Sequence, residues 1–225
     1  MKEKRALVFG GGSDLGSATV NRLIESGWQV HWTYHESNKP QAGERTRIDL
    51  RVQQDLEEFF CKIEGGEKFD LVVTSSFPFL ESPNSDFLGY VKAEAFLRSH
   101  VYIMTEGRRI LSEQGRIINI LGQCVERGLP GAAFYSASLS FLHNLGHSIN
   151  GKEGKERGIS VCDILLGPAE TREWDGLSEE IVDRYRDRVK EFITPDQVAE
   201  TIQFIAQSRV MPSTFKLDGY YGYGS

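Results

Sequence analysis

The stretch from residue 10 to residue 16 is a glycine-rich turn of the kind that binds anions. Gly10, Gly12 and Gly16 follow an apolar run at residues 7–9 and precede a helical pattern of apolar residues. Glycines let the backbone turn tightly and approach an anion, and the free amides at the start of a helix point toward it. Because the unit opens a chain that alternates strands and helices, it predicts a phosphate cradle rather than a tight turn alone.

The patterning of apolar residues predicts the scaffold that positions this cradle. Strands are expected at residues 7–9, 29–33, 45–48, 69–74, 116–120, 159–165 and 215–217. Helices are expected after the turn, at residues 55–63, 87–112, 134–149 and 178–192, and from a start at residues 194–197. Gly89 and Gly107 are the candidate break points of the long helix. This alternation predicts an α/β fold, a Rossmann-like doubly wound parallel sheet of about seven strands with helices on both faces.

Three finer expectations concern these helices. Phe134, Ser138, Phe141, Leu142, Leu145 and Ile149 fit one helical face of the segment 134–149. The start of the last helix carries Thr194 as a cap, Pro195 in the first turn and Gln197 three residues after the cap. This is the pattern of a capping box.

Length, charge and cysteine usage limit the class of protein. The chain has 225 residues and a formal net charge of −6, which favour one domain over residues 1–225 and argue against a nucleic-acid or anionic-membrane surface. No apolar run approaches the ~20 residues that cross a bilayer, and no signal peptide is expected. Cys61, Cys124 and Cys162 lack metal-ligand spacing. We therefore expect reduced thiols, no metal site and a cytoplasmic protein.

Ordered motifs along essentially the whole chain resemble the short-chain dehydrogenase/reductase family, in particular its 3-oxoacyl-carrier-protein reductases. The matching positions are Gly10, Gly12 and Gly16; Asp49 and Leu50; residues 115–120; residues 135–138, which begin with Tyr135; residues 158–161; Gly167, Pro168 and Thr171; and residues 217–219. Each motif alone is weak, and their order along the chain carries the resemblance.

The resemblance implies a nicotinamide dinucleotide cofactor. The residues assigned to it are Gly10, Gly12, Ser13, Asp14, Leu15, Gly16, His35, Lys39, Asp49, Leu50, Thr74, Ser75, Ser76, Gly167, Pro168 and Thr171. Members that bind NAD place an acid at the end of the second strand, whereas here Thr33, Tyr34 and His35 end it and Glu36 comes one step later. Lys39 either meets a 2′-phosphate or is a solvated loop charge. We therefore expect NADP, with NAD as the alternative.

The cradle and a later loop depart from the family pattern. Asp14 occupies the middle glycine position of the family's first motif. Its short side chain can cap the new helix, so we expect Asp14 to accept a hydrogen bond near Gly16 or Ser17 and to leave the cradle open. Its charge should cost some affinity for a diphosphate. Residues 74–77 read Thr-Ser-Ser-Phe, where the family has Asn-Asn-Ala-Gly.

Of the four active-site residues that the family would place, only Tyr135 is present. The serine position thirteen residues before it is Gly122, the lysine position four residues after it is Leu139, and His100 takes the asparagine position. The resemblance gives the tyrosine the role of proton donor to a carbonyl oxygen. A tyrosine has an ordinary pKa of about 10, and a nearby ammonium shifts it toward neutrality. The loss of the lysine should therefore slow the reaction.

Polar residues near these gaps are candidates for replacement groups. Gln123 carries an amide donor and His100 approaches from the neighbouring helix; with Tyr135 they form the expected catalytic set. The alternative for Gln123 is a solvent-facing loop residue, and for His100 a helical residue satisfied by its surroundings. His143 lies two turns after Tyr135, and His147, a further turn away, is expected to lie out of reach.

Two classes of function stay open. The first is an NADP-dependent oxidoreductase with a rebuilt active site that interconverts carbonyl and hydroxyl groups on a small or carrier-bound substrate; the otherwise intact frame favours it. The second is an impaired family member that binds a nucleotide or ligand as a sensor, partner subunit or non-redox catalyst; Gly122 and Leu139 favour it. The resemblance also implies a homodimer or homotetramer that acts on a small-molecule or carrier-bound partner, with no nucleic acid and no membrane.

Overall fold

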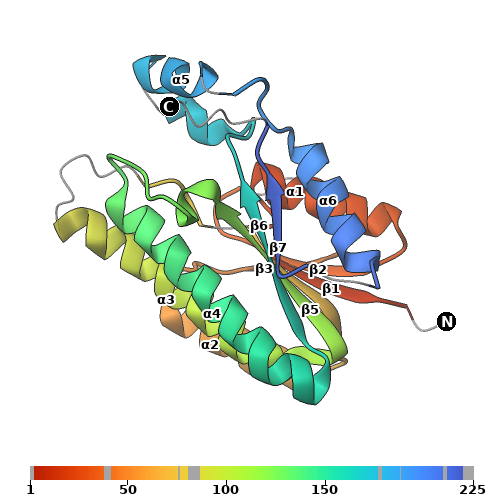
Figure 1. Ribbon diagram of the computed structural model, residues 1–225. Coiled ribbons are helices and arrows are strands. Elements are labelled where there is room, and N and C mark those ends of the chain that lie inside the picture. Colours follow the sequence, from red (N-terminus) through yellow and green to blue (C-terminus); the bar gives the residue numbers. More distant parts are fainter. Residues whose placement is uncertain are drawn as a thin grey trace.

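A seven-stranded parallel sheet forms the centre of the protein (Figure 1). The computed structural model describes residues 3–37, 42–75, 77–80, 87–176, 179–187, 189–209 and 212–219. The strand order is β3-β2-β1-β4-β5-β6-β7, and every neighbouring pair is parallel. The strands are β1 (Arg5–Phe9), β2 (Gln29–Tyr34), β3 (Glu44–Arg47), β4 (Phe69–Thr74), β5 (Leu111–Gly122), β6 (Ser160–Leu166) and β7 (Thr214–Leu217).

Helices cover both faces of this sheet. They are α1 (Asp14–Glu25), α2 (Gln53–Glu64), α3 (Phe87–Ile110), α4 (Ala133–Arg157), α5 (Glu179–Arg186) and α6 (Pro195–Gln207), with two 3-10 turns, η1 (Gln123–Val125) and η2 (Arg172–Gly176). In Figure 1, α2, α3 and α4 lie together on one face, and α1 and α6 lie on the other. The predicted α/β fold, a doubly wound parallel sheet, is confirmed.

The strands are apolar on both sides because both faces of the sheet are covered. In β1, Leu7 and Phe9 pack into the core beneath α2, α3 and α4, whereas Ala6 and Val8 pack into the core beneath α1 and α6. Alternate side chains of a strand point to opposite faces. The short apolar run that precedes the glycine-rich turn therefore anchors the turn in two cores at once.

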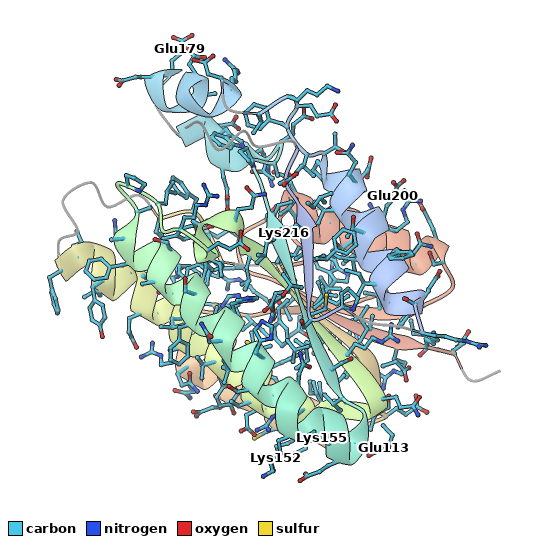
Figure 2. All side chains as sticks on the ribbon, in the orientation of Figure 1. Glu113, Lys152, Lys155, Glu179, Glu200 and Lys216 are labelled. Carbon is cyan, nitrogen blue, oxygen red and sulfur yellow. The ribbon has the colours of Figure 1, made fainter. Side chains whose placement is uncertain are left out.

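The helices α1 and α6 are also joined at their surface. Arg22 of α1 lies 2.8 Å from the carboxylate of Glu200 in α6, which is labelled in Figure 2. Gln203 donates a hydrogen bond to Ser26 Oγ at 2.6 Å. A helix near the start of the sequence is therefore held in place by one near its end.

Several boundaries differ from their predicted positions. α3 is one continuous helix, since Gly89 and Gly107 are buried at packing contacts rather than at breaks. β5 begins at Leu111, earlier than predicted, and the charged segment before α6 is helical only as far as Arg186. Phe141, predicted on the buried face of α4, is 52% exposed. The capping box at the start of α6 is confirmed.

The strand order reverses at β1, and the crevice of such a sheet is expected there. The chain runs outward from β1 through β2 to β3, and then returns to β4 on the other side of β1. Open α/β sheets bind ligands at the carboxyl ends of strands beside such a switch point. The glycine-rich turn lies at this edge, as do the segments that follow β4, β5 and β6.

Among the described residues, no helix is long and apolar enough to cross a membrane.

Candidate functional site

The turn between β1 and α1 is closed by its own backbone and by one serine. Gly10 has a φ of +79°, which favours glycine, and its carbonyl accepts a hydrogen bond from the Ser13 amide at 2.9 Å. Ser13 is the N-cap of α1, because its Oγ accepts from the Gly16 amide at 3.0 Å. The prediction that Asp14 caps this helix is wrong: Asp14 is already inside the first helical turn.

The glycines of the turn are required by close packing. A Cβ on Gly16 would collide with the Gly10 carbonyl and lie 2.7 Å from Ser75 Oγ, and a Cβ on Gly12 would collide with the Ser37 carbonyl. The start of α1 is thus pressed against the ends of β1 and β4. The hydrogen bonds of the turn leave the Leu15 amide without a partner among the described residues. An unpaired amide at a helix N-terminus is a donor suited to an anion.

Asp14 binds Arg172, a residue that is not among the predicted site residues. Its carboxylate accepts hydrogen bonds from the Arg172 amide at 2.9 Å and from Arg172 Nε at 3.1 and 3.2 Å. Arg172 begins η2, directly after Thr171 in the segment that follows β6. The two residues are 158 positions apart, so no local pattern in the sequence indicates the pair.

The loops after β2 and β3 bring His35 and Asp49 together. His35 Nε2 lies 3.4 Å from Asp49 Oδ2, and Arg51 donates to both oxygens of Asp49 at 2.9 and 2.8 Å. The hydrogen bonds from Arg51 lower the pKa of the Asp49 carboxyl below its ordinary value. Leu50 is a buried core residue, and Lys39 lies outside the described residues.

The end of β4 is tied to its neighbours on both sides. Thr74 Oγ1 donates to Asn119 Oδ1 of β5 at 3.0 Å, and the Ser75 amide donates to the Phe9 carbonyl of β1 at 3.0 Å. Ser13 Oγ also lies 3.3 Å from the Ser75 carbonyl oxygen. Thr74 and Ser75 therefore hold the ends of three strands in register at the cradle. Ser76 lies outside the described residues.

Tyr135 stands beside Gly122, and so does Leu139; the resemblance implies a serine at position 122 and a lysine at position 139. A Cβ built on Gly122 would lie 3.2 Å from the Tyr135 hydroxyl and 3.3 Å from both Cys124 Sγ and Leu139 Cδ1. Leu139 is buried in the core under α4. The predicted neighbourhood of Tyr135, Gly122 and Leu139 is present, and it is lined by apolar atoms and a thiol. Burial raises the pKa of Cys124 to about 12.

Two phenylalanines from the segment after β4 extend this apolar lining. The rings of Phe77 and Phe79 lie 5.8 and 5.3 Å from the Tyr135 ring, both in edge-on geometry. Phe77 also lies 5.1 Å from the ring of His100. Aromatic pairs at these distances pack favourably. The loop that carries Thr-Ser-Ser-Phe in this chain therefore turns an aromatic side chain toward the tyrosine.

Gln123 and His100 each have a buried polar atom with no partner in the structure described. His100 donates its Nδ1 hydrogen to the Phe96 carbonyl at 2.8 Å, which leaves Nε2 as a bare acceptor. Burial lowers the pKa of His100 to about 4, so the ring is neutral. Gln123 Nε2 is the second such atom. The alternatives foreseen for these residues, a solvent-facing amide and a satisfied histidine, do not describe these atoms.

The segment after β6 connects the sheet to η2. A Cβ on Gly167 would lie 2.8 Å from the Asp218 carbonyl, and the Gly167 amide donates to the Leu217 carbonyl at 2.8 Å. The Pro168 carbonyl accepts from the Ile193 amide at 3.0 Å, and the Thr171 carbonyl from the Trp174 amide at 3.2 Å. These contacts fix the path of the chain from β6 to Arg172.

A buried polar chain, from Thr74 through Asn119 and Asp163 to His143, links the cradle to α4. Asn119 Nδ2 donates to Asp163 Oδ1 at 2.7 Å, and His143 Nδ1 donates to Asp163 Oδ2 at 2.7 Å. The hydrogen bond to Asp163 raises the pKa of His143 above its ordinary value. His147 lies next to His143, with 3.2 Å between their Nε2 atoms. In the sequence, the only sign of this series of hydrogen bonds is Asp163, an acidic residue among the apolar residues of β6.

Among the described residues, no group of three or more His, Cys, Asp or Glu side chains is placed to hold a metal ion. At the outer edge of the sheet, Lys216 of β7, labelled in Figure 2, lies 2.6 Å from Glu126, which follows η1. The polar groups at this edge of the sheet that could contact a ligand include the Leu15 amide, Arg172, Tyr135, His100 Nε2 and Gln123 Nε2.

The fold, the cradle and the tyrosine helix agree with a family model described as "Enoyl-(Acyl carrier protein) reductase", which the sequence matches over residues 11–214. The chain belongs to the short-chain dehydrogenase/reductase family. Among curated proteins, the 3-amino-tetrahydro-pyrrolizinone reductase of Xenorhabdus hominickii is 26% identical over 236 aligned positions, which cover 96% of this chain and 79% of that protein.

Solved structures of similar fold extend over almost all of the chain. A dehydrogenase/reductase from Sinorhizobium meliloti 1021 has a TM-score of 0.87 at 23% identity, with 98% of this chain and 96% of that chain covered. BdcA in complex with NADPH has a TM-score of 0.84 at 21% identity, with 97% of this chain and 94% of that chain covered. A blue fluorescent protein from a metagenomic library, also in complex with NADPH, has a TM-score of 0.85 at 22% sequence identity, with 97% of each chain covered. This likeness shows the fold.

Proposed function

We propose that the protein is an NADP-dependent reductase that converts a carbonyl group to a hydroxyl group on a small or carrier-bound substrate. The observation that carries the proposal is the position of the Tyr135 hydroxyl, beside Gly122 at the carboxyl end of β5. Membership in a family of oxidoreductases supports the reaction class. Two structural neighbours, BdcA and the blue fluorescent protein, are complexes with NADPH, which supports the choice of nucleotide.

The residues of the crevice fit a dinucleotide. The unpartnered Leu15 amide and the start of α1 would hold its diphosphate, with Gly10, Gly12, Ser13 and Gly16 shaping the turn beneath it. Further residues proposed to line the nucleotide are Asp14, His35, Lys39, Asp49, Leu50, Thr74, Ser75, Ser76, Gly167, Pro168 and Thr171. When bound, the nicotinamide supplies the hydride.

Tyr135 is the proposed proton donor. Its Oη would give a proton to the oxygen of the substrate carbonyl as that oxygen gains negative charge. Residue 139, one helical turn later, is a leucine and adds no charge to tune the hydroxyl. The protein is therefore proposed to catalyse this step more slowly than a member of the family that carries the lysine.

Gln123 and His100 are proposed to assist Tyr135. The free amide hydrogens of Gln123 would donate to the substrate oxygen, the task that the family gives to a serine hydroxyl. The bare Nε2 of His100 would accept a hydrogen bond from the substrate or from a water molecule. A buried polar atom without a partner costs stability unless a ligand satisfies it. Their pairing with a ligand would recover that cost on binding.

The test begins with nucleotide binding and continues to turnover. Calorimetric titration with NADPH and NADH should give tighter binding of NADPH. NADPH oxidation with a panel of ketones and 3-oxoacyl thioesters should then identify a substrate whose rate falls about 10²- to 10⁴-fold in Tyr135→Phe. Tighter binding of NADH would overturn the nucleotide assignment. An unchanged rate in Tyr135→Phe would exclude Tyr135 as the proton donor.

The second candidate is a family member that binds nucleotide without turning over a carbonyl substrate. The residues Gly122 and Leu139, which leave the tyrosine without its usual partners, favour it. NADPH binding without oxidation by any carbonyl in the panel is the result that this candidate requires.

A homodimer or homotetramer is proposed for the assembled protein. Phe87, Leu88, Tyr90 and Val91 at the start of α3 and Phe141 on α4 are exposed large apolar side chains on adjacent helices. Such a surface is typical of an interface. Light scattering coupled to size-exclusion chromatography tests this: a monomeric mass at micromolar concentration would exclude the proposal.

A further inference from the structure

The contact between Asp14 and Arg172 joins the phosphate cradle to η2. Asp14 lies in the first turn of α1, and its side chain is 18% exposed. Arg172 binds it through the backbone amide and through Nε, with three donor–acceptor distances of 2.9 to 3.2 Å. The segment after β6 is thereby fastened directly to the helix whose N-terminus forms the cradle.

Asp14 by itself is an unfavourable residue for a diphosphate site. A carboxylate in the first turn of a helix interacts well with the helix dipole, but it repels a phosphate that approaches the same amides. Arg172 supplies the opposite charge at hydrogen-bond distance from both carboxylate oxygens. The pair therefore removes the main electrostatic objection to an acid at this position.

Arg172 retains donors after it has bound Asp14. Its contacts use the backbone amide and Nε, and neither Nη1 nor Nη2 has a hydrogen-bond partner among the described residues. The side chain is 58% exposed. A guanidinium carries five donors in a planar fork that matches phosphate oxygens. One edge of the fork is held by Asp14, and the outer edge remains open.

We propose that Arg172 is a diphosphate-binding residue of this protein and that Asp14 is the residue that positions it. This inference rests on the proposed function, since its ligand is the diphosphate shared by both nicotinamide dinucleotides. Asp14 restricts the long arginine side chain before the ligand arrives, so that less conformational entropy is lost on binding. The outer guanidinium edge then donates to phosphate oxygens while Nε stays on Asp14.

The experiment compares Arg172→Ala with Arg109→Ala by calorimetric titration of NADPH and of NADH. Arg109 is the control, because it is a comparably exposed arginine that pairs with Glu106 of its own helix and lies at the end of α3, just before β5 begins and away from the carboxyl ends of the strands. Losing charged hydrogen bonds in Arg172→Ala should weaken the binding of both nucleotides about 10- to 100-fold, whereas Arg109→Ala should bind both as the wild type does. Equal weakening of the two nucleotides is required, because the diphosphate is common to both.

A second substitution separates a ligand contact from a structural role. In the Arg172→Ala background, the Asp14 carboxylate has lost its hydrogen bonds from the Arg172 side chain and its charge still repels a phosphate, so adding Asp14→Ala should tighten NADPH binding by roughly two- to fivefold. If the Asp14–Arg172 pair had only a structural role, removing Asp14 as well would not restore any of the affinity for NADPH. Circular dichroism and thermal melts establish that each variant is folded. Recovery in the double variant, together with the loss in Arg172→Ala, supports the proposal.

The negative results distinguish an error in the proposed function from an error in the role of Arg172. If the wild-type protein binds neither nucleotide, the proposed function is wrong and this inference falls with it. If the wild-type protein binds NADPH and Arg172→Ala binds it as Arg109→Ala does, only the role of Arg172 is wrong. Weakening confined to NADPH would move Arg172 to the 2′-phosphate and overturn the assignment to the diphosphate.

Discussion

The turn after β1 and the segment after β5 differ in how they depend on side chains. The turn keeps its shape with Asp14 in place of a glycine, because backbone amides and close packing define it and Arg172 neutralises the new charge. The region around Tyr135 is instead defined by side chains: the Tyr135 hydroxyl, Leu139 and Cys124 surround the position at which Gly122 has no side chain. Geometry made by the backbone tolerates substitution, whereas the chemistry of a site made by side chains changes with each of them.

The largest effect is expected from breaking the packing of the turn. Gly16→Val should cost roughly 3 kcal/mol or more of the free energy of unfolding, because the new side chain collides with the Gly10 carbonyl and Ser75. It should also abolish nucleotide binding. Chemical denaturation and calorimetry measure the two effects. Gly151→Ala is the control, since a Cβ on Gly151 meets no atom within 4 Å; a stable, binding Gly16→Val would show that the turn is not set by close packing.

The polar chain that joins the two regions should respond next. His143→Leu leaves the buried Asp163 carboxylate with one fewer charged hydrogen bond, which should cost roughly 1.5–3 kcal/mol of the free energy of unfolding. His143→Gln keeps a donor and should cost less. Urea denaturation at pH 6 compares the three proteins. Equal stability in all of them would mean that the Asp163–His143 hydrogen bond contributes nothing.

The same pair predicts a pH dependence of stability. The pKa of His143 is raised in the folded protein by Asp163, so its contribution is fully present below the unfolded pKa of about 6.5. The contribution is lost as the pH rises through the folded pKa. The free energy of unfolding should therefore fall, as the pH rises above about 6.5, more steeply in the wild type than in His143→Gln. Parallel pH profiles would contradict this.

The next prediction concerns the rate of the reaction when a lysine and a serine are introduced near Tyr135. Leu139→Lys together with Gly122→Ser should raise the rate of NADPH-dependent ketone reduction about 10- to 100-fold, and either change alone should do less because such groups act as a unit. Leu139→Met, which keeps volume without charge, is the control. The double variant should melt at a lower temperature, since Leu139 is buried. A folded, NADPH-binding double variant with no gain would refute the reductase proposal.

The smallest effect concerns the cysteine next to the tyrosine. Burial raises the pKa of Cys124 and of Cys162 to about 12 each, so neither should be alkylated at pH 8, where both remain thiols. Cys61 on α2 is exposed and should react. Peptide mass mapping after brief iodoacetamide treatment measures all three. Rapid labelling of Cys124 would show that water reaches the region around Tyr135.

The sequence predicted the fold because apolar periodicity and glycine turns are local signals. Helical spacing predicted that Leu139 lies near Tyr135, whereas the nearness of Gly122 was implied by the family resemblance; both are present in the structure. It missed Arg172 because that residue meets Asp14 across the whole length of the fold. It assigned the helix cap to Asp14 when Ser13, one residue earlier, has the extended backbone that a cap requires.

Other errors came from competition between neighbouring signals. Phe141 fits the apolar pattern of α4, yet the helix leaves it exposed beside α3, where a pattern within one helix gives no information on what covers it. Asp163 lies within an apolar strand, and only the arrival of Asn119 and His143 from other elements accounts for it. Pairings across elements require the fold before they can be recognised.

The packing of α1 on α6 has a consequence for how the chain folds as it is made. β1 and α1 leave the ribosome before α6, and domains tend to fold from the N-terminal end as synthesis proceeds. The contacts of Arg22 and Ser26 with α6, however, cannot form before Glu200 and Gln203 have been synthesised. Until those residues emerge, one face of α1 stays uncovered. The nascent protein thus completes the packing of α1 only after more than 170 further residues have been added.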